Sequence, residues 1–279
     1  MPHRAVIDIT VFLVVFLGVT GILTALRRGL PVGRRLVSAL QAVMEPHRRG
    51  DYEAALQATE GLRFRGEVTS QYCYFRGANL ALLGRLDEAE VWLRRNIEMQ
   101  KGTEKRLLAV AYTTLGQVLL QAERYDEARK CFETSMQYFP GRGSGYRSMA
   151  EMYLLRGDNP AEALRWAELA VEREKADRGM TTEIRKLNLG EDLATLAWST
   201  AAATHDRSEV TRLVSEAVDS VGTSNVQSTA LVQYQSGRAY TEVGDTQAST
   251  KHYQEAARLD PQGHWGRAAR KALEVRQSV

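Results

Sequence analysis

The chain has 279 residues, of which 44% are hydrophobic and 25% are charged, and it contains only six prolines. This composition is typical of an ordered globular protein and excludes a disordered or proline-rich chain. The formal net charge is +3, but residues 1–50 hold seven arginines and no lysine against Asp8 and Glu45, which leaves 30 basic and 32 acidic side chains in residues 51–279. The basic excess therefore lies at the N-terminus, and the body of the chain lacks the concentrated positive charge of a nucleic-acid-binding protein.

An uncharged apolar run occupies residues 9–26, ITVFLVVFLGVTGILTAL. At 1.5 Å per residue a helix of this length spans roughly 27 Å, close to the hydrocarbon thickness of a bilayer. We predict a transmembrane helix over about residues 5–26 rather than a secretory signal peptide, which would need a shorter apolar core and a small-residue cleavage site. Residues 1–33 would then form a membrane anchor that ends in a turn at residues 29–33.

The arginines that flank this run predict its orientation. Arg4 and the terminal amine stand on one side, and four arginines follow on the other side: Arg27, Arg28, Arg34 and Arg35. By the positive-inside rule the C-terminal part lies in the cytoplasm, and the same four side chains could touch anionic lipid headgroups. The inverted topology, with the C-terminal part outside the cytoplasm, is the alternative.

Residues 109–140, AVAYTTLGQVLLQAERYDEARKCFETSMQYFP, have the pattern of two amphipathic helices. Positions three or four apart share one face of a helix; on the first helix these are Tyr112, Leu115, Gly116 and Leu119. On the second helix they are Tyr125, Ala128, Phe132 and Ser135. The small residues let two helix backbones approach closely, the large ones fill the space between them, and Pro140 ends the unit because proline disfavours a helix at the residue before it.

This pattern resembles the tetratricopeptide repeat, a helix pair of 34 residues. One helix pair cannot bury its apolar face alone, so the resemblance implies several stacked copies. Matching the Gly/Asp–Tyr–x–x–Ala segment that opens each second helix gives six units, which start near residues 36, 70, 109, 143, 191 and 230, the fifth being degenerate. The charged segment 172–188 would connect units four and five, and residues 264–276 would form a helix that caps the stack. We therefore expect an all-α chain, with an α-solenoid of about six helix pairs over residues 34–279 behind the N-terminal transmembrane helix.

The sequence contains no recognisable catalytic or metal-binding constellation. Its five histidines lie far apart, and Cys73 and Cys131 form no Cys-x-x-Cys pair and are expected to be buried free thiols. The glycine-rich stretch at residues 140–145 lacks the Lys-Ser/Thr ending of a phosphate-binding loop and is better explained as a turn between repeats. We expect no enzyme activity, no cofactor or metal, and no nucleic-acid or small-molecule substrate.

In tetratricopeptide stacks the first helix of each pair lines a concave groove, and the resemblance therefore implies a protein partner there. The residues matched to groove positions and chosen for their side chains are Tyr74, Thr113, Gln117, Arg147, Glu151, Tyr234 and Arg238. Tyrosine and arginine are enriched at protein-binding hot spots. The Lys and Asn with which some members of the family grip a peptide carboxylate are missing at matching positions, so that binding mode is not expected.

Two functions fit these features. The first is a bacterial membrane-tethered scaffold or adaptor that recruits or assembles partner proteins. The alternative is a non-catalytic structural subunit of a larger membrane complex, in which Gly21 and Ala25 would form a small-x-x-x-small contact between transmembrane helices.

Overall fold

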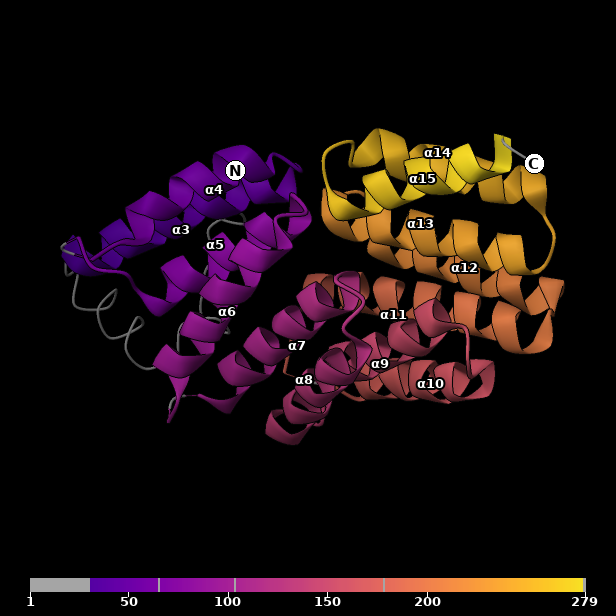
Figure 1. The fold of residues 1–279 in the computed structure, drawn as a ribbon, viewed down its shortest axis with the longest axis horizontal. Helices are drawn as coiled ribbons and strands as arrows, with labels where there is room; N and C mark the ends of the chain where they lie inside the picture. Colours follow the sequence, from indigo (N-terminus) through magenta and orange to yellow (C-terminus); the bar gives the residue numbers. More distant parts are fainter. Residues whose placement is uncertain (1–30, 65, 103, 178, 278–279) are drawn as a thin grey trace.

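The computed structural model describes residues 31–64, 66–102, 104–177 and 179–277. Over these residues the chain forms thirteen α-helices, one short 3₁₀-helix and a single isolated β-bridge between Phe64 and Glu67. The predicted all-α class and the α-solenoid are confirmed (Figure 1).

The helices form six antiparallel pairs, here called units one to six, followed by a last helix. The first helices of the units are α3 (Pro31–Arg48), α5 (Ser70–Leu82), α7 (Lys105–Gln121), α9 (Gly143–Arg156), α11 (Thr182–Thr204) and α13 (Val226–Glu242). The second helices are α4 (Tyr52–Ala58), extended by η1 (Thr59–Leu62), then α6 (Leu86–Gln100), α8 (Tyr125–Tyr138), α10 (Pro160–Ala176), α12 (Arg207–Val221) and α14 (Thr246–Leu259). Helix α15 (His264–Gln277) packs on α14 and α13 at the end of the stack, as the sequence predicts for a cap.

The turn inside each unit contains one residue in the left-handed region of the backbone. Glycine supplies it in four units, at Gly50, Gly84, Gly157 and Gly244, with φ between 70° and 82°. Glu123 in unit three and His205 in unit five adopt φ of 59° and 54° without being glycine. A residue with a β-carbon is strained in this conformation by roughly 1 kcal/mol. The turns of units three and five therefore carry backbone strain that the four glycine turns avoid.

Side-chain caps explain where many of the helices begin. An oxygen of the residue before the helix accepts a hydrogen bond from an N–H of the first turn, which has no partner inside the helix. This holds for Asp51, Thr69, Asn159, Thr181, Asp206, Asn225 and Asp245. Pro160 at the first position of α10 adds a preset φ.

Close contact between paired helices depends on the small residues that the sequence pattern identified. A β-carbon added at Gly116 would collide with the ring of Phe132, and one at Gly237 would collide with the ring of Tyr253. Ala128, on the facing helix of unit three, is fully buried. Units two, three and six therefore place glycine against a large side chain in the way that the repeat pattern predicts.

Two predicted boundaries are wrong. The predicted turn at residues 29–33 does not extend to Pro31, because α3 begins there; proline suits the first position of a helix. Unit five begins at Thr182 rather than near residue 191, because Thr181 caps a helix of 23 residues through the N–H of Ile184. The segment 172–188 is therefore mostly helix, as the end of α10 and the beginning of α11.

The predicted membrane anchor lies outside the described residues. Within the described parts of the chain, no helix combines the length and the apolar character that crossing a bilayer requires. Residues 5–26, Arg27 and Arg28 are not among them, and of the four flanking arginines only the side chain of Arg35 is described, where it is exposed. The transmembrane helix and the division into residues 1–33 and 34–279 stay predictions.

The stack curls until its two ends meet. Helices α3 to α5 approach the α13–α15 end of the molecule across the top of Figure 1. A β-carbon added at Gly50, in the turn of unit one, would lie 3.1 Å from Cγ1 of Val226 at the start of α13. A β-carbon added at Gly84, in the turn of unit two, would lie 2.9 Å from a terminal nitrogen of Arg267 in α15. The two ends of the solenoid therefore approach each other across its concave inner face.

Candidate functional site

The curl of the stack surrounds a central cavity of about 520 Å³, which is partly open to solvent. One side, here called the first wall, is formed by the C-terminal end of α3 and by one face of α5 and of α7. The opposite side, the second wall, is formed by the N-terminal ends of α9, α11 and α13 and by the first turn of α15. All six first helices and the cap thus contribute to one cavity.

The two walls differ in chemistry. The first wall presents mainly apolar, hydroxyl and amide side chains, among them Tyr74, Ala78, Val110, Thr113, Gln117 and Gln121. The second wall contains the charged side chains Arg142, Arg147, Glu183 and Glu191. Arg142 donates a hydrogen bond to Ser144 at 3.1 Å, and within the described residues neither Arg142 nor Glu183 forms an ion pair.

A hydrogen-bond network crosses the inner side of the stack beside the cavity. The Gln117 amide donates to Ser148 Oγ at 2.8 Å and to Glu151 Oε2 at 2.9 Å. The Gln235 amide donates to Glu151 Oε1 at 2.5 Å, and Gln235 Oε1 accepts from Thr195 at 2.8 Å. The network joins α7, α9, α11 and α13, and it occupies both carboxylate oxygens of Glu151.

A cluster of buried charges supports the second wall. Arg147 forms ion pairs with Glu191 at 2.6 Å and with Asp192 at 3.0 Å. Asp192 and Glu174 are completely buried, and each has one carboxylate oxygen without a hydrogen-bond partner. Burial raises the pKa of the Asp192 carboxyl to about 7, even though the nearby Arg147 guanidinium acts to lower it. Burial likewise raises the pKa values of Glu151 and Glu174.

Gly143 makes room for this cluster. A β-carbon at Gly143 would collide with Asp192 Oδ2 and would lie 2.8 Å from the carbonyl oxygen of Ala170. The first residue of α9 therefore has to be glycine for the Asp192 carboxylate to lie between α9, α10 and α11. The glycine-rich stretch at residues 140–145 thus provides space for a buried carboxylate as well as a turn between units.

Comparisons with known proteins identify the repeats. A tetratricopeptide-repeat family model matches residues 70–141, and a second matches residues 230–262. The chain contains tetratricopeptide repeats. The first match covers units two and three, and the second covers most of unit six. A search of curated proteins found no similar sequence.

Solved structures with similar folds have low sequence identity. BtubC (BKLC) from P. vanneervenii is 15% identical, with a TM-score of 0.47 over 82% of this chain and 91% of that chain. Yeast Tom70 is 17% identical, with a TM-score of 0.48 over 89% of this chain and 51% of that chain. YrrB, described as a TPR protein with an unusual peptide-binding site, is 18% identical, with a TM-score of 0.34 over 73% of this chain and 92% of that chain. At these TM-scores the similarities carry no functional inference for this chain.

Four of the seven predicted groove residues line the central cavity of the tetratricopeptide stack. Tyr74, Thr113 and Gln117 belong to the first wall and Arg147 to the second. Thr113 shares a hydrogen bond with Ser135 at 2.7 Å, and Gln117 and Arg147 take part in the contacts described above. These side chains are therefore held in fixed positions, and only part of each faces the cavity.

The other three predicted groove residues do not line the cavity. Glu151 is buried in the hydrogen-bond network. Tyr234 is buried between Tyr253 and Trp265, with ring centroids 5.8 and 5.5 Å away, because α15 covers this end of α13. Arg238 lies over the Trp198 ring, 4.3 Å from its centroid, and donates a hydrogen bond to the Tyr234 hydroxyl at 3.3 Å. In this curled stack Tyr234 is part of the core and Arg238 is partly buried against α11.

Sequence reasoning missed the contributions of α3, α11 and α15 to the cavity. Met44, His47 and Arg48 come from the atypical first helix, whose repeat register Pro46 obscures. Five residues of α11 line the second wall: Glu183, Ile184, Leu187, Asn188 and Glu191. All except Glu191 precede the predicted start of unit five. The Thr-x-x-Ile cap at Thr181 was the signal that could have moved this boundary.

Burial disfavours the charged form of the two histidines that line the cavity. Burial lowers the pKa of His264 to about 4 and also lowers the pKa of His47, whose Nδ1 lies 2.9 Å from Asn79 Oδ1. Within the described residues no group of three or more His, Cys, Asp or Glu side chains is arranged to hold a metal ion. The cavity therefore offers shape, hydrogen bonds and charge, the features that support binding.

Proposed function

We propose that this chain is a membrane-tethered scaffold that binds a segment of a partner protein in its central cavity and has no catalytic activity of its own. Proteins with tetratricopeptide repeats generally mediate protein–protein interactions and scaffolding. The observation that carries the proposal is the cavity of about 520 Å³, to which every first helix contributes.

The chemistry of the cavity supports a peptide ligand. An extended peptide exposes backbone N–H and C=O groups, which need hydrogen-bonding partners when water is removed. Gln121, Thr114 and Asn188 line the cavity and carry such groups, while Tyr74 and Val110 supply apolar surface. Arg142 and Glu183 add charged groups on the second wall that can orient the ligand.

Membrane tethering rests on the sequence. The uncharged run at residues 9–26 and the following arginines support an anchor with the repeats in the cytoplasm. Extraction of native membranes with alkaline carbonate should leave the full-length chain in the pellet, and a reporter fused to the C-terminus should show a cytoplasmic location. Release of the chain by carbonate would contradict the anchor, and an external reporter signal would contradict the orientation.

The binding function can be tested by filling the cavity. Ala78 lies on the first wall and is partly exposed, so Ala78→Trp should occupy space that a ligand needs. Crosslinking pull-down from native membranes with a C-terminally tagged chain should then recover at least thirtyfold less partner, which corresponds to a hot-spot loss of about 2 kcal/mol. Recovery equal to that of the unaltered chain would rule out the cavity as the binding site.

Ala161→Trp provides the matched control, since Ala161 is exposed in the first turn of α10 and does not line the cavity. It should recover the partner normally. Partners recovered in a fixed ratio would favour the structural-subunit alternative, whereas a variable set would favour the adaptor.

A further inference from the structure

The two ends of the stack touch through backbone turns. The contacts, here called the seam, join the turns of units one and two to unit six and the cap. Gly50 faces Val226, and Gly84 faces the guanidinium of Arg267. Both glycines have φ of about 80°, a conformation that favours glycine, so the backbone itself forms one side of the seam.

A buried polar pair joins the two sides of the seam. Tyr52 of α4 and Asp260, which follows α14, are buried and face each other, and the Tyr52 hydroxyl interacts with the Asp260 carboxylate. Asp260 Oδ1 also accepts a hydrogen bond from the N–H of Gly263 at 3.1 Å. One hydrogen bond to a charged group contributes only about 1.5–3 kcal/mol, so this pair can hold the seam closed and still be broken reversibly.

Apolar packing does not extend across the seam within the described residues. One core cluster surrounds Leu40, Val43 and Tyr72 in units one and two, and another surrounds Tyr253 and Ala269 at the cap. Among the described residues, none of the helices α3–α6 packs closely on α13, α14 or α15. Burial of apolar surface is the main favourable contribution to a stable contact, and the seam has little of it.

We propose that the seam is a reversible clasp, whose opening separates the two walls of the central cavity and admits the ligand. The identity of that ligand as a segment of a partner protein rests on the proposed function. First-wall residues such as Met44 and His47 stand on one side of the seam, and second-wall residues such as Asn225 and His264 stand on the other. Movement at the seam therefore changes the width of the cavity directly.

The size of the closed cavity limits what it can hold. An α-helix with its side chains has a diameter of about 10–12 Å and occupies roughly 420–610 Å³ per turn of 5.4 Å. The cavity, at about 520 Å³, is of the same order as one such turn. The occupant we infer is therefore a short peptide segment of about one helical turn or its extended equivalent, and a longer helix would require an open clasp.

A disulfide can lock the clasp. A β-carbon at Gly50 would lie 3.8 Å from the β-carbon of Val226, which is the usual separation in disulfides. The full-length Gly50→Cys, Val226→Cys variant should therefore crosslink under mild oxidation. Failure of the folded variant to crosslink would overturn the proposal, because the closed state would not be populated.

Access to the cavity is measured with a third thiol, Ala78→Cys, on the first wall. N-ethylmaleimide is the probe, and mass spectrometry of the fragment containing residue 78 gives its rate of labelling. We expect labelling to be at least tenfold slower with the clasp oxidised than with it reduced. Equal rates would show that the cavity is reached by another route and would overturn the proposal. The native Cys73 and Cys131 react slowly, since burial raises the pKa values of both thiols, that of Cys131 to about 11.

A variant without new seam cysteines keeps the test independent of disulfide formation. Arg267→Ala, in the Ala78→Cys chain, removes the side chain that covers Gly84 and should increase labelling at residue 78 several-fold. Arg258→Ala is the matched control, because Arg258 pairs with Glu255 on the exposed side of α14. A response of both variants, or of neither, would contradict a clasp at the seam.

None of these assays contains a partner protein. A working clasp with no recoverable partner would therefore disprove the proposed function alone.

Discussion

Units two and three bury different side chains from units four and five. Between α5 and α8 the buried residues are mostly apolar, such as Leu93, Leu115 and Phe132, and the charged side chains lie outside. Between α9 and α12 the buried set also includes the carboxylates of Glu151, Glu174 and Asp192. The family model matches units two and three and not units four and five. The tetratricopeptide sequence pattern thus reflects apolar packing between helices. The buried charges that support the second wall of the cavity lie in units four and five, which match that pattern least.

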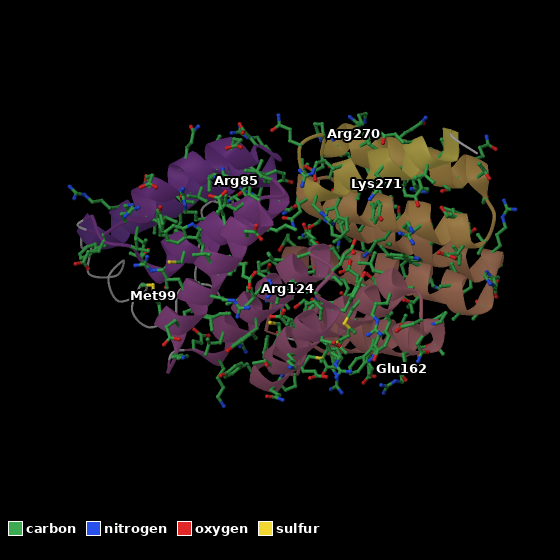
Figure 2. All side chains as sticks on the ribbon, in the orientation of Figure 1. Arg85, Met99, Arg124, Glu162, Arg270 and Lys271 are labelled. Atoms are coloured by element: carbon green, nitrogen blue, oxygen red, sulfur yellow. The ribbon has the colours of Figure 1, made fainter. Side chains whose placement is uncertain are left out.

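The largest expected loss of stability comes from replacing an arginine by alanine in units four and five. The same substitution in units two and three should cost much less. Arg147→Ala removes the guanidinium that pairs with Glu191 and Asp192 and leaves buried carboxylates unpaired, which should cost about 3–5 kcal/mol. Arg124, labelled in Figure 2, forms partly exposed pairs with Glu90 and Glu127 in units two and three. Arg124→Ala breaks them and should cost about 1 kcal/mol or less. Urea unfolding of both variants measures the difference, and equal losses would contradict the distinction between the regions.

Overpacking tests the apolar region. Ala128 is completely buried in unit three, so Ala128→Trp should destabilise the chain by about 1–3 kcal/mol or more. Ala128→Ser changes the volume little and should be milder. Thermal melts followed by circular dichroism compare the two, and identical melting temperatures would argue against the assigned packing of α7 on α8.

The pH dependence of stability tests the charged region. The pKa of Asp192 is raised from 3.8 to about 7, so the folded chain keeps this proton while the unfolded chain loses it. The stabilisation is therefore present at low pH and is lost as the pH rises from about 4 to 7, by at most about 1.4 kcal/mol per pH unit for one group. Asp192→Asn should flatten this slope in unfolding titrations between pH 4.5 and 7.5. An unchanged slope would show that Asp192 ionises normally in the folded chain.

The smallest expected effects come from the turns. Glu123 in unit three has a φ of 59° and an exposed side chain, so Glu123→Gly should relieve strain and stabilise the chain by about 0.5–1 kcal/mol. In unit four Gly157 has a φ of 70° and open space around it, so Gly157→Ala should destabilise by about 1 kcal/mol from backbone strain alone. Shifts of the same sign in denaturant midpoints would contradict this explanation of the turns.

Much of the fold follows from local rules that the sequence displays. Helix periodicity, small residues such as Gly116 and Ala128, and the opening segment of each second helix predict six helix pairs and a cap, all of which the structure contains. The boundary of unit five was missed because the first turns of α11, residues 182–190, are rich in charged and polar side chains and lack the repeat's small-residue pattern.

The site could be predicted only in part, because its shape depends on how far the stack curls. Tyr74 and Thr113 follow from their position on first helices. The burial of Tyr234 and the approach of Gly84 to Arg267 depend on small rotations that accumulate over six units. Such rotations are properties of the whole assembly, and a single repeat does not encode them.

The bond between Glu151 and Gln235 joins residues 84 positions apart and connects unit four to unit six without passing through unit five. Repeat proteins ordinarily behave as one-dimensional arrays in which each unit stabilises only its neighbours. A link that skips one unit breaks that rule, and the Thr195–Gln235 bond ties unit five into the same network, so the unfolding of units four, five and six is coupled. Units four to six should therefore melt as one cooperative block, and fraying of the stack would begin in the units before it.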